Sequence, residues 1–166
     1  SPFYKRLSKR KFQHCVFRLG ARDDLTKLLE TFKGAVFPWE IDVMGHMNVR
    51  YYTAKYDEAT LQLFGALGLT VAYFRDQDRG MAAVQQNTTY ARELLAGDLV
   101  VITSEVLEIG ERKIQFRHTM VECLTGDVAS TCQITGVHID RTMRRSTAFP
   151  DHIRTKALEL AGDLAE

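Results

Sequence analysis

The spacing of apolar side chains changes along this chain, and each change marks a predicted element. From Val49 onward the apolar positions step by three or four residues, at Tyr52, Tyr56, Ala59, Leu63 and Leu67. That period places them on one face of an α-helix. Lys55, Glu58 and Gln62 are predicted to share another, polar face. Asn48 stands just before this run, where its side chain can satisfy a free N–H group of the first turn. The pattern therefore predicts a long amphipathic helix.

Alternating apolar and polar residues, the pattern of a strand with one buried face, precede and follow this helix. One such run covers residues 31–39. Four more strands are predicted further along the chain, at about 81–91, 99–108, 112–124 and 128–140. Glycine-containing segments typical of hairpin turns separate these four, and no helical pattern lies between them. The order predicts an α+β fold in which an antiparallel five-stranded sheet wraps around one long helix, and a dimer is expected from its edge strands and short core.

The composition is that of one soluble globular domain. The chain has 166 residues, of which 45% are hydrophobic, and its formal net charge is +1. Its apolar runs are far shorter than the roughly 20 residues that cross a bilayer, so we expect no contact with a membrane. Three cysteines without a CxxC pair imply neither a disulfide framework nor a zinc site. The cytoplasm is therefore the expected location.

Charge is distributed unevenly along the chain. Residues 1–22 hold seven Lys and Arg and no Asp or Glu. We interpret residues 1–30 as a basic N-terminal extension, 31–153 as the folded domain and 154–166 as a C-terminal helical tail. A nucleic-acid-binding arm and a transit segment are the alternatives for the extension, and both are disfavoured against a solvated tail. A first residue other than Met suggests a processed chain or a piece of a longer one.

The segment before the predicted helix concentrates the residues that can do chemistry. Asp42 lies six residues before Asn48, close enough to fold back over the helix start, and Gly45 supplies the backbone freedom that this requires. The free N–H groups of a first helical turn, at the positive end of the helix dipole, suit a carbonyl oxygen that becomes negative during acyl transfer. An Asx turn is the structural alternative for Asp42.

These residues also resemble a known family. The pattern Asp-x-x-Gly-His-x-Asn-x-x-Tyr, formed by Asp42, Gly45, His46, Asn48 and Tyr51, resembles the signature of hotdog-fold acyl-CoA thioesterases of the 4-hydroxybenzoyl-CoA thioesterase type. The likeness covers about residues 31–153. Three segments, 80–87, 92–98 and 135–141, are similar to betainyl-CoA thioesterases of carnitine breakdown. The resemblance implies a hotdog fold, an acyl-CoA substrate, and sites built between the subunits of a homodimer or homotetramer.

The resemblance also implies catalytic roles. Asp42 would activate a water as general base or attack the thioester carbonyl itself. His46 would polarise the carbonyl, orient the acid or hold the water, and Asn48 would cap the helix or donate to substrate. The backbone N–H of Val49 is the candidate oxyanion donor. Glu58 is the rival acid, because some hotdog enzymes carry the catalytic carboxylate on the helix.

Three groups of residues are candidates for binding the substrate. Amides on the first strand after the helix could border a pocket or an interface, and these are Gln86 and Asn87 with their neighbour Gln85. Basic side chains could hold the CoA phosphates or form a solvated rim, and these are Arg112, Lys113 and Arg141, with Arg144 and Arg145. Aromatic side chains could form a box for a trimethylammonium acyl group or belong to the core, and these are Trp39, Tyr51 and Tyr52, with Tyr56 and Phe74.

No metal-ligand cluster, P-loop or dinucleotide fingerprint is present in the sequence. We therefore expect no bound cofactor, since CoA enters as part of the substrate. The leading hypothesis is a thioesterase that hydrolyses a small polar acyl-CoA such as betainyl-CoA. Two hypotheses from other classes are a hotdog hydratase or dehydratase that acts on an acyl thioester, and a non-catalytic module that binds acyl-CoA or RNA.

Overall fold

The computed structural model describes residues 28–162, so most of the predicted basic extension lies outside the described residues. The strands are β1 (Leu29–Ala35), β2 (Arg79–Tyr90), β3 (Leu99–Ile109), β4 (Lys113–Glu122), β5 (Val128–Asp140) and β6 (Arg145–Ser146). The helices are α1 (Val49–Leu67), α2 (Val71–Asp76), α3 (Asp151–Ala161) and the short 3-10 helix η3 (Pro38–Glu40). None of the helices within residues 28–162 is long and apolar enough to span a membrane.

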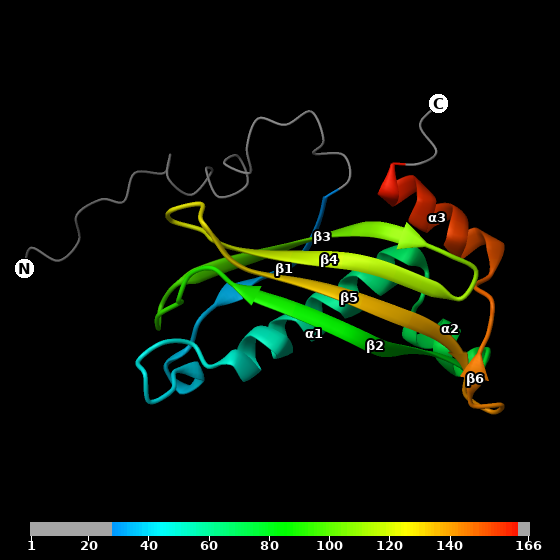
Figure 1. The fold of residues 1–166 in the computed structure, drawn as a ribbon, viewed down its shortest axis with the longest axis horizontal. Helices are drawn as coiled ribbons and strands as arrows, with labels where there is room; N and C mark the ends of the chain where they lie inside the picture. The colour runs from blue at the N-terminus through cyan, green and yellow to red at the C-terminus, as the bar shows by residue number, and fades with distance from the viewer. Residues whose placement is uncertain (1–27, 163–166) are drawn as a thin grey trace, which may run out of the picture.

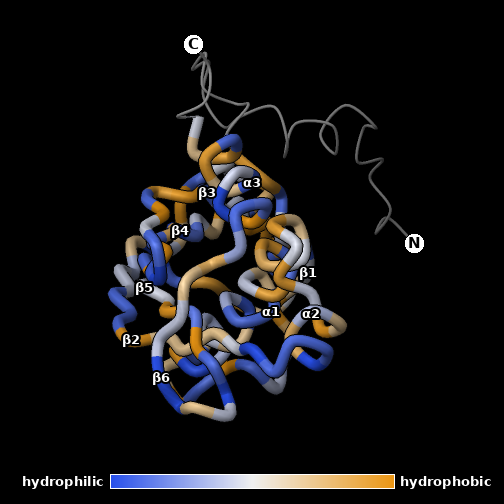
Figure 2. The backbone as a smooth tube through the Cα atoms, turned by 90° about the vertical axis from the view of Figure 1, so that its right-hand side faces the viewer, coloured by the Kyte–Doolittle hydropathy of each residue, from blue (hydrophilic) through white to orange (hydrophobic). Residues whose placement is uncertain are grey.

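The sheet wraps around α1. Its five long strands lie in the order β1-β3-β4-β5-β2, each antiparallel to its neighbours, and β6 pairs with the end of β5 (Figure 1). Seen from the side, β3, β4, β5 and β2 form an arc with α1 inside its curve (Figure 2). This is the hotdog arrangement, and the predicted fold class is confirmed.

The buried face of α1 is the one that the apolar spacing predicts. All five predicted positions are at most 3% exposed and belong to one core with the inner face of the sheet, and they are Tyr52, Tyr56, Ala59, Leu63 and Leu67. Asn48 caps the helix, because its Oδ1 accepts a hydrogen bond of 3.0 Å from the backbone N–H of Arg50. The prediction that Lys55 lies on the polar face of the helix was wrong, since Lys55 is only 5% exposed. Lys55 is three residues after Tyr52 and four before Ala59, which puts it on their face.

The first strand ends earlier than the alternation predicts. β1 stops at Ala35, and Val36 leaves the sheet to donate to the carbonyl of Asp98 at 2.8 Å. Pro38, which has no N–H to donate to a strand ladder, then begins η3. At the other end of the chain, α3 runs across the boundary predicted at residue 153. It does so because Ile153 and Ala157, one turn apart, both join the common core.

Candidate active site

The loop between η3 and α1 folds back on itself and brings Asp42 to the start of the helix. The N–H of Asp42 donates to the carbonyl of His46 at 3.0 Å, and the N–H of Gly45 donates to the carbonyl of Asp42 at 3.0 Å. Gly45 has a φ of +85°, a backbone conformation that side-chain-bearing residues rarely adopt. Ile41 and Met47 form an isolated bridge that closes the base of the loop.

The two carboxylate oxygens of Asp42 have different partners. Oδ1 accepts the N–H of Met44 at 2.8 Å, which is the Asx turn expected as the structural alternative. Oδ2 accepts the side-chain amide of Asn48 at 3.3 Å. The Asp42 side chain is 22% exposed, so a water molecule can reach it. Asp42 can therefore form the Asx turn and still be accessible for a role as base or nucleophile.

The first turn of α1 offers one unengaged backbone donor. The N–H of Arg50 donates to the Asn48 side chain, and the N–H of Tyr51 donates to the Asn48 carbonyl at 2.9 Å. The N–H of Val49 makes no hydrogen bond to any described residue, and Val49 is 57% exposed. The candidate oxyanion donor is thus free and lies at the positive end of the helix dipole.

His46 lies on the same loop but is not hydrogen-bonded to the acid. Its Nδ1 is 3.9 Å from Asp42 Oδ1, too long for a hydrogen bond, and its side chain is 35% exposed. The ring can attract the carboxylate when it is protonated. A role in orienting Asp42 or holding water therefore requires a small movement or an intervening water.

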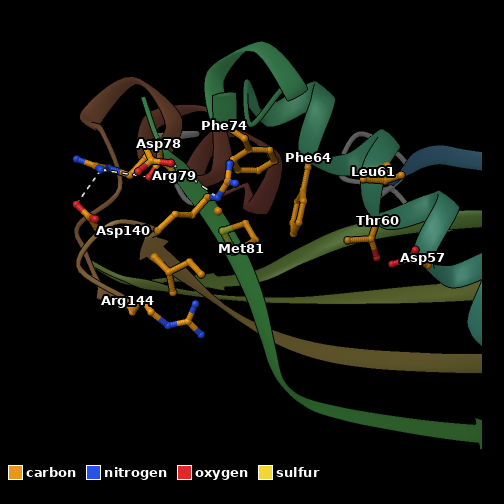
Figure 3. Close-up of a pocket in the computed structure, with 13 residues that line it drawn as sticks. Asp57, Thr60, Leu61, Phe64, Phe74, Asp78, Arg79, Met81, Asp140 and Arg144 are labelled. Atoms are coloured by element: carbon orange, nitrogen blue, oxygen red, sulfur yellow. Dashed lines mark hydrogen bonds and ion pairs between the residues drawn. The ribbon is translucent and has the colours of Figure 1, made fainter. Parts of the chain in front are cut away.

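Two connected cavities run beside α1. The smaller, about 530 Å³, lies by the first turns of the helix, and the larger, about 790 Å³, lies by the start of β2 (Figure 3). Both are lined by Asp57, Thr60, Phe64 and Met81, so they form one groove between α1 and β2. Gln86 of β2 lines the smaller cavity, whereas its exposed neighbour Asn87 lines neither.

The acid on the helix that faces this groove is Asp57. Glu58, the residue chosen from the sequence, is exposed and lines neither cavity. Adjacent residues of a helix differ by about 100° in direction, so only one of the two can face the groove. The signal was present in the sequence, because Asp57 shares a helical face with Arg50, Thr53, Thr60 and Phe64, all of which line the cavities.

A family comparison shows to which proteins this chain is related. Residues 36–157, most of the chain, match the model of the thioesterase-like superfamily. The chain belongs to this superfamily. The predicted class of enzyme, a thioester hydrolase, is confirmed at the level of the family.

The relatives of this thioesterase-like chain include proteins linked to CoA. A Staphylococcus aureus protein in complex with CoA superimposes with a TM-score of 0.75, at 21% identity over 81% of this chain and 85% of that one. A 1,4-dihydroxy-2-naphthoyl-CoA thioesterase from Synechocystis gives a TM-score of 0.70, at 14% identity over 79% of this chain and 96% of the other. At such identities these likenesses show the fold.

A relative with two named activities is similar in sequence. It is the L-carnitine dehydrogenase/betainyl-CoA thioesterase of Rhizobium meliloti, which is 22% identical over 121 residues. These residues make up 73% of this chain and 24% of the relative, so the match spans about a quarter of the relative's length.

The basic residues of this thioesterase-like chain fall into two places. Arg141 and Arg144 line the larger cavity together with Arg79, which was not predicted from the sequence. Arg79 is 2.8 Å from Asp140 and Arg141 is 3.8 Å from Asp78, while no described residue pairs with Arg144 (Figure 3). The predicted Arg112 and Lys113 lie outside the groove, beside Glu111 and Glu108 respectively.

The aromatic candidates also occupy separate places. Trp39 is 69% exposed and stacks on Phe37 with ring centroids 4.5 Å apart, and the Tyr51 hydroxyl donates to the Trp39 carbonyl. Tyr52 and Tyr56 are buried in the core. Phe74, from α2, lines the larger cavity. A single chain therefore does not assemble these residues into one aromatic box.

Among residues 28–162, no group of three or more His, Cys, Asp or Glu side chains is placed to hold a metal ion. The two buried histidines have structural partners. His118 is bonded to Ser104 and Thr60, and burial lowers its pKa to about 4. His138 is bonded to Tyr73, and burial lowers its pKa as well. Burial disfavours the charged form of both rings, and neither ring is hydrogen-bonded to a residue of the Asp42 loop.

Proposed function

We propose that this chain hydrolyses the thioester of a small polar acyl-CoA, with betainyl-CoA as a candidate, to the free acid and CoA. The observation that carries this proposal is that a solvent-accessible carboxylate, Asp42, is hydrogen-bonded to the cap residue Asn48 of the helix whose first N–H, that of Val49, is unengaged. A base and an oxyanion donor side by side are what acyl transfer to water requires. Family membership supports the same reaction.

The proposed chemistry has two steps. Asp42 takes a proton from a water molecule whose oxygen attacks the thioester carbon, and the carbonyl oxygen becomes negative and accepts the N–H of Val49. The tetrahedral intermediate then collapses, the carbon–sulfur bond breaks, and CoA leaves as a thiolate that acquires a proton. Direct attack by Asp42 would instead give an acyl anhydride that water hydrolyses. Trapping of an acylated Asp42 distinguishes the two routes.

The groove supports a polar acyl group. Asp57 makes no ion pair or hydrogen bond with a described residue, and the rings of Phe64 and Phe74 line the larger cavity beside it. A carboxylate beside aromatic faces favours a cationic group such as a trimethylammonium. We further propose that Arg144, with Arg79 and Arg141, attracts the phosphates of CoA.

A second copy of the chain is the proposed partner. β2 is an edge strand of 12 residues whose residues 83–87 are exposed, and long unpaired edges are usually covered in native proteins. Antiparallel pairing of two β2 strands about a twofold axis would set the end of one beside the start of the other. The helix start of one subunit would then approach the larger cavity of its partner. A cytoplasmic location stays a prediction.

The test measures free thiol released from betainyl, short-chain and aromatic acyl-CoAs by the wild type and by Asp42→Asn. The side-chain oxygen of an asparagine at this position can still accept the N–H of Met44, so the Asx turn should be kept, although its NH2 group cannot replace Oδ2 as the acceptor for Asn48. We expect kcat to fall about 10³-fold, the range for loss of a general base. Asp76→Asn, which alters an exposed acid on α2, is the matched control. Turnover that survives Asp42→Asn would exclude this mechanism. Conversion of an acyl-CoA without thiol release would favour the hydratase or dehydratase.

The acyl preference has its own test, with betainyl-CoA and its uncharged isostere 3,3-dimethylbutyryl-CoA. Asp57→Asn should lower kcat/KM for betainyl-CoA about fivefold and leave the isostere unchanged, because only the charge is lost. Glu58→Gln, one residue away but outside the groove, should affect neither substrate. Equal losses on both substrates would assign Asp57 a role other than reading charge.

A further inference from the structure

A buried ion pair lies directly beneath the Asp42 loop. Lys55 Nζ is 2.7 Å from Glu40 Oε1 and 3.0 Å from Oε2, and the two side chains are only 6% and 8% exposed. Lys55 projects from the second turn of α1, and Glu40 is the last residue of η3, two residues before Asp42. The pair therefore connects the helix to the root of the loop.

Both partners use their remaining hydrogen-bonding capacity on the same stretch of backbone. The third proton of Lys55 reaches the carbonyl of Ala35 at 3.3 Å, and Glu40 Oε2 also accepts the N–H of Phe37 at 2.9 Å. Lys55 Nζ lies 5.6 Å from the centre of the Phe32 ring as well. We call Glu40 and Lys55 the loop clamp, since between them they hold the end of β1, the start of the loop and α1.

The loop clamp is linked to Asp42 through a short path. The carbonyl of Glu40 accepts the N–H of Asn48 at 2.9 Å, and the side-chain amide of Asn48 donates to Asp42 Oδ2. The position of the carboxylate relative to the helix start is thus set by contacts that begin at Glu40. Movement of this root by even 1 Å would move Asp42 away from the N–H of Val49, and errors of that size can cost catalysis about 100-fold.

We propose that Glu40 and Lys55 are positioning residues for the hydrolysis, holding Asp42 beside the Val49 N–H. Burial of an ion pair adds little stability over an apolar pair of the same size, because both charges lose their hydration. The contribution of the Glu40–Lys55 pair is therefore to fix the position of the Asp42 loop rather than to raise the stability of the fold. The inference rests on the proposed function.

The test separates position from stability. Lys55→Met alone leaves a buried carboxylate without its partner and should lower the melting temperature. The double variant Glu40→Gln/Lys55→Met removes both charges, and its melting temperature should return to within about 3 °C of the wild type. We expect its kcat to stay at least about tenfold below the wild type, with KM within about twofold. Recovery of kcat together with the melting temperature would overturn the proposal.

A readout that does not depend on turnover accompanies the kinetics. Amide hydrogen exchange at Asp42 and Asn48 should become at least about tenfold faster in the double variant, while the amides of β4 keep their protection. If the wild type releases no thiol, the proposed function fails, and the exchange data still report whether the pair holds the loop. Unchanged exchange at Asp42 and Asn48 would show that it does not.

Two further variants complete the design. Glu40→Asp keeps both charges and draws the carboxylate back by one carbon, so it should fold and still lose kcat with KM within about twofold. Wild-type kcat in Glu40→Asp, if the double variant does not fold, would overturn the proposal. Glu105→Gln/Arg117→Met removes a partly exposed pair, 2.6 Å apart, on the sheet, and should change neither kcat nor loop exchange.

Discussion

Two buried polar clusters fasten α1 to the rest of the domain, and they differ in charge. The loop clamp uses the charges of Lys55 and Glu40 to hold the Asp42 loop. The second cluster, which we call the sheet clamp, is uncharged and runs from α1 into the sheet through Thr60, His118, Ser104 and Thr31. The ion pair therefore holds the Asp42 loop, which has no strand pairing of its own beyond the Ile41–Met47 bridge. The neutral network holds α1 against the sheet.

The donor and the acceptor of each hydrogen bond in the sheet clamp can be assigned from the Thr60 end of the network. The Thr60 hydroxyl donates to the carbonyl of Tyr56 at 2.8 Å, so it accepts from His118 Nε2 at 2.9 Å. His118 Nδ1 then accepts from the Ser104 hydroxyl at 2.6 Å, and the Thr31 hydroxyl shares its one proton between Ser104 Oγ at 2.6 Å and the carbonyl of Ile102 at 3.3 Å. The ring is neutral in this arrangement, which agrees with a pKa that burial lowers to about 4. The network therefore depends on histidine staying uncharged.

The largest expected effect comes from removing the centre of the sheet clamp. His118→Ala should lower the free energy of unfolding by about 4 kcal/mol, because it opens a cavity at a fully buried site and leaves two hydroxyl groups with a missing partner. Denaturant unfolding at pH 7 measures the change. His152→Ala, on the exposed face of α3, should stay within about 0.5 kcal/mol of the wild type. If His118→Ala also changed the free energy of unfolding by no more than about 0.5 kcal/mol, the sheet clamp would not stabilise the fold.

The second largest effect should come from protonating the sheet clamp at low pH. The folded state holds the pKa of His118 at about 4, below its ordinary value of 6.5, so the unfolded chain binds more protons between these values. The stability that the neutral His118 ring contributes is therefore fully present above pH 6.5 and is lost as the pH falls toward 4. From pH 7 to pH 5 the wild type should lose about 2 kcal/mol more than His118→Ala, as measured by denaturant unfolding at each pH. Parallel losses in the two proteins would assign the acid sensitivity to other groups.

The sequence predicts this fold well because its signals are local. The apolar period of α1, the cap at Asn48 and the fold-back at Gly45 each involve residues within a few positions of one another, and the structure contains all three. The predicted first strand extended four residues past the end of β1, because alternation alone does not reveal where a chain leaves a sheet. The ladder ends at Ala35, where Val36 turns to the carbonyl of Asp98.

What the sequence did not reveal depends on how α1 is rotated against the sheet. Lys55 was placed on the polar face although it is buried, and Glu58 was chosen as the rival acid although its neighbour Asp57 is the one that lines the cavity. The charge on Lys55 argued for exposure, and its partner Glu40 is 15 residues distant. Arg79 was missed because it reaches the cavity through the pairing of β2 with β5, which brings it to Asp140 from 61 residues away.

The smallest predicted effect tests whether the Thr60 hydroxyl matters to the sheet clamp. Thr60→Val keeps the side-chain shape and leaves the Nε2–H of His118 without an acceptor, which should lower the free energy of unfolding by about 1.5 kcal/mol. Thr60→Ser keeps the hydroxyl and loses one methyl group, so it should cost less, about 0.5 to 1 kcal/mol. Denaturant unfolding at pH 7 gives both values. If Thr60→Val were as stable as Thr60→Ser, the hydrogen bond from His118 to α1 would contribute nothing to the free energy of unfolding.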